Sequence, residues 1–110
     1  MGKNDYFVLV YRILTYLKEC FMAGDSPDID MIGPEALKIP NGYWTNIMES
    51  IYNEGYVIGV YVVPRAGGAP GIKLSNLKIT QKGIEYLEDN SKMAKVADFL
   101  KAVKETIPGI

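Results

Sequence analysis

The stretch Asn53-Glu54-Gly55-Tyr56-Val57-Ile58 constrains this 110-residue chain most strongly. The residues before it, 41–54, place apolar side chains at helical spacing. These side chains are Trp44, Ile47, Met48 and Ile51. Gly55 suits the end of a helix, because glycine adopts the left-handed conformation found there. β-Branched and aromatic residues follow at once, over 56–63. The stretch therefore predicts a helix that leads through one glycine directly into a strand.

The residues that follow predict a β-hairpin. Residues 64–71 read Pro-Arg-Ala-Gly-Gly-Ala-Pro-Gly, which is typical of a turn or loop. Residues 72–79 alternate imperfectly between apolar and polar side chains and predict a returning strand. Two strands around such a loop form a hairpin.

Two further helices are predicted on the N-terminal side. Residues 5–23 read as a helix capped by Asn4 or Asp5. Its apolar face is expected to hold Phe7, Val10, Leu14, Leu17 and Phe21. A short helix is expected to open at Pro34 and to end at Ile39-Pro40. Asn41 is then the expected cap of the third helix.

Two additional helices are predicted after the hairpin. Thr80 caps the first, which runs to about Asp89, and Asn90 suits a left-handed position after it. Ser91 is expected to cap the second, which runs to about Ile107. The apolar arc of that last helix is wider than one packed face needs. We therefore expect it to pack on the first helix or to form a homodimer.

The order of these elements is that of a winged helix, in which three helices form a small core and a β-hairpin beside the third helix is the wing. We expect one α+β domain over residues 1–110, a winged helix-turn-helix with two additional C-terminal helices. No internal repeat or linker interrupts it.

Two blocks of sequence resemble a known family. Residues 53–60 read NEGYVIGV, and residues 79–93 read ITQKGIEYLEDNSKM. In these blocks the chain is similar to the YjcQ-like family of small bacterial and prophage proteins. The resemblance implies a winged-helix fold with a C-terminal helical extension and a phage-derived origin. It carries over no catalytic motif.

Composition excludes several kinds of site. The chain has no histidine, so Ser-His and Cys-His nucleophile pairs cannot form. Cys20 is the only cysteine, which rules out an intramolecular disulfide and a Cys/His zinc site. The acidic residues Asp25, Asp28, Asp30 and Glu35 lack the spacing of a calcium loop. We expect no enzyme activity, cofactor, metal or small-molecule substrate.

The sequence also bears on where the protein works. No apolar run reaches the roughly 18 residues of a membrane span, and the first residues lack the apolar segment of a signal peptide. We therefore expect a cytoplasmic protein without a membrane partner.

The third helix and the hairpin hold the candidate DNA-binding residues. On the helix, Asn46, Ser50 and Asn53 could contact base edges, and Tyr43 or Thr45 could contact phosphate. The same face carries Glu49 and no lysine or arginine, which is equally typical of a solvated polar surface. On the hairpin, Arg65 at the tip and Lys73 on the return strand could contact phosphate. The alternative is an ordinary turn with solubilising charges.

Charge leaves two functions open. The whole chain has 12 basic and 13 acidic side chains, so it lacks a strongly basic footprint. Residues 1–55 sum to −4 and residues 56–110 to +3. The positive second half favours a non-enzymatic regulatory protein that binds double-stranded DNA. The acidic first half and the lysine-free third helix favour the alternative, a winged helix that binds another protein.

Overall fold

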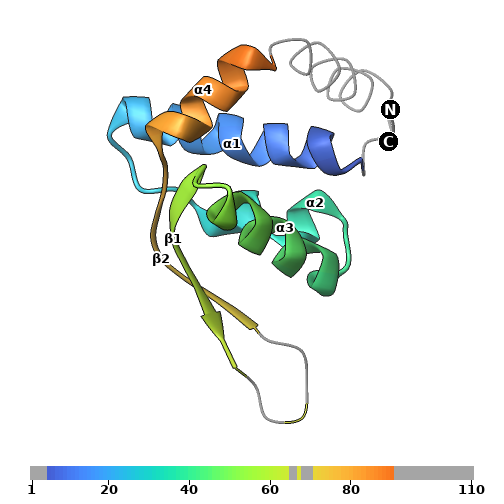
Figure 1. Ribbon diagram of the computed structural model, residues 1–110. Helices are drawn as coiled ribbons and strands as arrows, with labels where there is room; N and C mark the ends of the chain where they lie inside the picture. Colours follow the sequence, from blue (N-terminus) through green and yellow to red (C-terminus); the bar gives the residue numbers. More distant parts are fainter. Residues whose placement is uncertain (1–4, 65–66, 68–70, 91–110) are drawn as a thin grey trace, which may run out of the picture.

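The structure, a computed structural model, describes residues 5–64, 67 and 71–90 (Figure 1). Three helical segments come first: α1 (Tyr6–Ala23), the 3₁₀ turn η1 (Ile29–Met31) with α2 (Pro34–Leu37), and α3 (Asn41–Asn53). The hairpin strands β1 (Val57–Val63) and β2 (Gly71–Ile79) follow, and α4 (Gln81–Asp89) ends the described part. This is an α+β arrangement, and its order is consistent with a winged helix. The predicted fifth helix lies outside the described residues.

Helix α1 begins and ends as its sequence indicates. The Asp5 carboxylate accepts a hydrogen bond from the backbone N–H of Phe7, which caps the first turn. Gly24 takes the left-handed conformation with φ of 75° and ends the helix. The prediction that Phe7 and Phe21 belong to the buried face is wrong, since they are 54% and 49% exposed. Phe7 lies in the first turn beside buried neighbours, with its ring edge-on to the Tyr6 ring, and Phe21 lies in the last turn, where it lines a groove.

The entry into α3 differs from prediction by one residue. Pro40, rather than Asn41, holds the N-cap position, with extended backbone and no side-chain capping bond. Asn41 is the first residue of the helix. A proline at the cap fixes the backbone dihedral φ and needs no N–H partner, so the chain turns into α3 without a polar cap.

The exit from α3 follows the predicted path through Gly55. This glycine has φ of 82°, and its N–H donates to the carbonyl of Tyr52. The N–H of Tyr56 donates to the carbonyl of Ile51. These two bonds form a Schellman motif, which satisfies the last carbonyls of the helix. The strand β1 then starts at Val57.

The two strands pair in antiparallel fashion with one irregularity. Val57 pairs with Ile79, and the regular register resumes from Val60 opposite Leu74. Ile58 pairs with Lys78, and between that pair and Val60–Leu74 one β1 residue, Gly59, faces three residues of β2. Gly59 has φ of 91°, and a Cβ there would lie 2.5 Å from the carbonyl oxygen of Ser75. Only glycine fits this bulge without strain.

The core lies between α1, α3 and the proximal half of the hairpin. Its fully buried members come from all three elements, and α4 adds Leu87. They include Leu9, Ile13, Leu14, Ile47, Met48, Ile51, Val57 and Ile79. The distal half of the hairpin extends away from this core (Figure 1). In the described part of the chain, no helix is long and apolar enough to cross a membrane.

Helix α4 is held against the start of β1. The Thr80 hydroxyl caps it by accepting from the Gly83 N–H and also donates to the carbonyl of Gly55. A Cβ on Gly83 would collide with the carbonyl oxygen of Tyr56, so glycine allows this close approach. The prediction of a left-handed Asn90 is wrong, since its φ is −114°. Its side-chain amide instead donates to the carbonyl of Tyr86, which satisfies the helix end.

Candidate nucleic-acid interface

The outward face of α3 is polar and carries no positive charge. Asn46 and Asn53 are exposed, while Thr45 and Glu49 are half-buried beside them. α3 contains no lysine or arginine anywhere between Asn41 and Asn53. This face offers amide groups that could bond to base edges, but nothing on it attracts phosphate.

Two of the predicted α3 residues face α1. The hydroxyls of Ser50 and Tyr6 form a hydrogen bond of 2.7 Å, in which either oxygen can be the donor. Ser50 is therefore half-buried and already bonded within the protein. Tyr43 is half-buried against the core. Burial, together with the nearby Asp5 and Tyr6, raises the pKa of Tyr43. The structure thus leaves Asn46 and Asn53 as the most accessible of the predicted helix residues.

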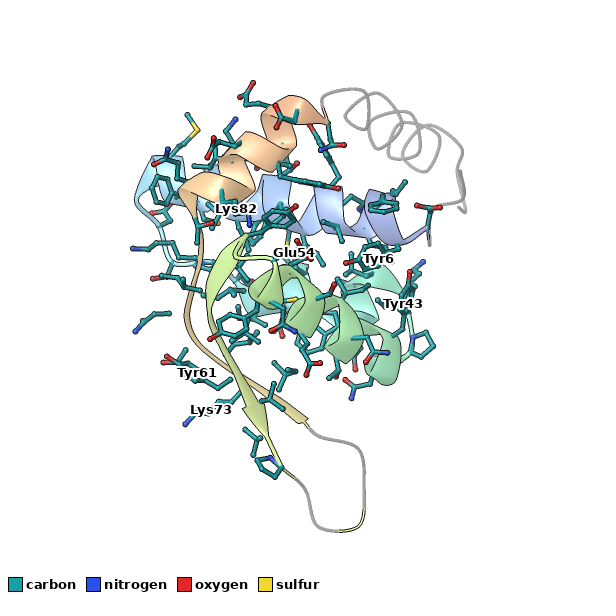
Figure 2. The ribbon with its side chains drawn as sticks, viewed as in Figure 1. Tyr6, Tyr43, Glu54, Tyr61, Lys73 and Lys82 are labelled. Atoms are coloured by element: carbon teal, nitrogen blue, oxygen red, sulfur yellow. The ribbon has the colours of Figure 1, made fainter. Side chains whose placement is uncertain are left out.

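The outer face of the hairpin carries the positive charge. Lys73 pairs across the strands with Tyr61, and Lys78 pairs with Ile58. Side chains of directly opposed residues lie on the same face of a sheet. All four residues are exposed, and neither strand contains an acidic residue. Figure 2 shows Tyr61 and Lys73 together on one side of the hairpin. We call Ile58, Tyr61, Lys73 and Lys78 the outer hairpin face. Arg65 lies outside the described residues.

A third lysine continues this charge into α4. The Lys82 ammonium nitrogen lies 5.9 Å from the centre of the Tyr56 ring, within the range of a cation–π contact. The Tyr56 ring packs in turn on Tyr86, with ring centres 4.8 Å apart. Burial and, after it, the charge of Glu54 raise the pKa of Tyr56. Glu54 and Lys82 therefore both lie near the Tyr56 ring.

The α3 face and the outer hairpin face are separate surfaces. Val60 packs into the core with α3 residues, so the inner face of β1 is turned toward α3. Tyr61 follows Val60 in the strand and points to the opposite side. The amides that could contact bases and the lysines that could contact phosphate therefore do not share one surface.

A groove of about 450 Å³ lies between the C-terminal end of α1, the loop after it and the bulged part of β2. Cys20 lines it beside Leu17, Phe21 and Leu77. Cys20 is half-buried. Within the described ranges, no three acidic or cysteine side chains gather closely enough to hold a metal ion.

Tyr61, Lys78 and Lys82 were not among the site residues predicted from the sequence. The signal that could have found them is the hairpin register, which places every second residue of each strand on the same face. The bulge at Gly59 interrupts that alternation. Counting along β2 alone therefore does not show which β1 residue each lysine faces.

The family model described as "YjcQ protein" matches residues 11–106. The chain belongs to the YjcQ family. That match covers α3, the hairpin and α4, and it confirms the resemblance drawn from the residues around Gly55 and Thr80. No curated protein and no solved structure matches the chain.

Proposed function

We propose that this YjcQ-family chain is a winged-helix protein that binds double-stranded DNA, with its hairpin, the wing, as the main contact to the phosphate backbone. The observation that supports this most is the outer hairpin face, which holds Lys73 and Lys78 and no acidic side chain. The rest of the described chain is predominantly acidic. Phosphate contacts of this kind position a protein on a duplex without reading its sequence.

The aromatic and aliphatic partners of the two lysines fit the same function. Tyr61 lies opposite Lys73, and Ile58 lies opposite Lys78. A strand ribbon with alternating cations and flat or branched side chains can lie along a groove and cover sugar and base edges while its ammonium groups reach phosphates. Because Asn46 and Asn53 lie on the separate α3 face, they are proposed to add base contacts only where the bound duplex reaches past the wing to α3.

A binding titration at several salt concentrations tests the proposal. Each phosphate neutralised by a lysine releases counterion, so the logarithm of the binding constant falls by about 0.9 per contact for each tenfold rise in salt. We expect the double change Lys73→Ala and Lys78→Ala to weaken binding to every duplex alike and to flatten the slope by roughly two units.

The matched control is Arg12→Ala, since Arg12 is an exposed cation that belongs to α1 and not to the hairpin. We expect it to leave the salt slope unchanged. Wild-type protein without measurable affinity for duplex DNA at about 50 mM salt would contradict the proposal.

A second candidate function is the binding of another protein through α3. The observation that favours it is the cation-free α3 face, where the exposed Tyr52 ring lies on the same helix as Glu49. Exposed tyrosines are enriched at protein interfaces, and an acidic face repels DNA. If the wild-type protein does not bind duplex DNA, protein binding through α3 becomes the better supported function.

A further inference from the structure

The free edge of β1 carries no charge within Val57–Val63, and Pro64 follows its last residue. Within the described residues the sheet has two strands, and β1 pairs only with β2. Every residue from Val57 to Val63 is uncharged. Exposed strand edges normally carry lysine, proline or a bulge, because unpaired N–H and C=O groups otherwise recruit another strand. The bulge opposite Gly59 is formed by three residues of β2, so β1 itself has no bulge, and its register from Val60 to Val63 is regular.

The edge of β2 is protected, in contrast. Lys73 and Lys78 lie on that strand, and Asn76 takes a left-handed conformation with φ of 54°. Asn76 and Lys78 also line the groove shared with the end of α1 and the loop after it. The lysines and the bulge that protect a strand edge therefore lie on β2, while β1 has a proline, Pro64, only after its last residue.

The side chains at the distal end of β1 are uncovered on both faces. Tyr61, Val62 and Val63 are 56%, 45% and 40% exposed. Val62 shares the inner face with Ile72, while Tyr61 and Val63 point to the outer side. A strand added at this edge would cover apolar surface above and below the sheet and would also satisfy the free backbone groups.

We propose that β1 of a second copy of this chain pairs with β1 in antiparallel fashion, about a two-fold axis at Val62. Two identical strands paired in this way form a closed, self-complementary dimer. Tyr61 of each copy then lies opposite Val63 of the other, an aromatic and β-branched pair of the kind that stabilises sheets. Because β1 holds no charge, no like charges face each other.

The two hairpins would form one four-stranded sheet with β2 at each outer edge. The outer hairpin face stays open in this dimer, since pairing uses the edge of β1 and not its surface. The inference does not rest on DNA binding. A contact of so few residues is smaller than the roughly 1,200–2,000 Å² of a stable interface, so the dimer should be weak and concentration-dependent.

Charged substitutions at Val62, the residue on the two-fold axis, test the β1–β1 pairing in the full-length chain. We expect Val62→Lys and Val62→Glu each to be monomeric in sedimentation velocity, because two like charges would meet at the axis. An equal mixture of the two variants should form a dimer at least as tight as the wild type. Ser75→Lys adds the same charge on β2 and should sediment as the wild type does. Circular dichroism shows that each variant is folded.

Hydrogen exchange of the wild-type chain gives a second measurement that needs no substitution. We expect the amides of residues 61–63 to exchange more slowly as protein concentration rises, while those of α3 do not change. Three results would overturn the proposal: a wild type that is monomeric at its highest soluble concentration, a Val62→Lys variant that dimerises as the wild type does, or a mixture of the two charged variants that stays monomeric.

Discussion

The indole Nε1–H of Trp44 donates a hydrogen bond to the carbonyl oxygen of Ile32, with 2.8 Å between nitrogen and oxygen. The bond is buried and joins the first half of α3 to the segment between η1 and α2. Trp44 is also part of the core. The ring therefore orients α3 within the three-helix arrangement and does not offer a face for stacking on nucleic-acid bases.

Replacing Trp44 tests the value of this bond. We expect Trp44→Phe to lower the free energy of unfolding by about 1–3 kcal/mol, because the Ile32 carbonyl is left buried without its partner. Urea unfolding followed by circular dichroism measures the change. Tyr52→Phe on the same helix is the control, and we expect less than about 0.5 kcal/mol there because its side chain is exposed. Equal stabilities for both variants would contradict this role of the bond.

The bulge at Gly59 gives a second prediction. Gly59→Ala should destabilise the protein by about 1–3 kcal/mol, since an alanine Cβ would meet the Ser75 carbonyl and φ is positive. Gly42→Ala is the matched control, because nothing lies within 4 Å of a Cβ at that position of α3. Alanine is favoured over glycine in helices by roughly 0.5–1 kcal/mol, so the control should be neutral or stabilising. Thermal unfolding of both variants decides the matter.

Local signals were sufficient to predict most of the fold. Gly55 marked the end of α3, and Thr80 marked the start of α4, because caps and left-handed turns depend on a few neighbouring residues. The turn η1 was missed, since Asp28 caps only three residues there. Phe7 and Phe21 were misplaced because helical spacing identifies a face but does not show which of its residues the rest of the chain covers.

The candidate site was less predictable for a related reason. Ser50 lies on the polar side of α3 in a helical projection, yet its hydroxyl bonds to Tyr6 of α1, 44 residues earlier. That contact depends on how two helices pack. Lys73 and Tyr61 likewise meet only through the hairpin register, which the bulge at Gly59 shifts. Spacing along one element cannot show such pairings.

The tyrosine cluster predicts how stability changes in alkali. Burial, followed by the charges of Tyr56 and Tyr6, raises the pKa of Tyr86 above its ordinary value of 10.0. The folded chain therefore keeps this phenol protonated at a pH where the unfolded chain ionises it. Its contribution to stability is fully present below about pH 10 and is lost as the pH rises through the raised pKa.

Urea unfolding between about pH 8 and pH 11 measures this loss. We expect the free energy of unfolding to fall less steeply with pH in Tyr86→Phe than in the wild type, because phenylalanine has no proton to lose. Tyr61→Phe, in an exposed position of the hairpin, should follow the wild-type curve. Identical slopes for wild type and Tyr86→Phe would show that this phenol does not contribute.

The role of α3 in DNA binding is the last prediction. Asn46 is exposed on α3, and an asparagine that bonds twice to an adenine contributes about 1–3 kcal/mol of discrimination at one base pair. We expect Asn46→Ala to lose that preference while the salt slope set by the wing lysines stays the same, because base contacts release no counterion. Glu49 lies beside Asn46 on the same face, so Glu49→Gln should tighten binding to every duplex by removing repulsion from phosphate. Titrations with duplexes that differ at single base pairs measure both effects. If neither substitution changes binding while Lys73→Ala does, α3 stays out of the groove, and its exposed face is then free to contact a protein partner.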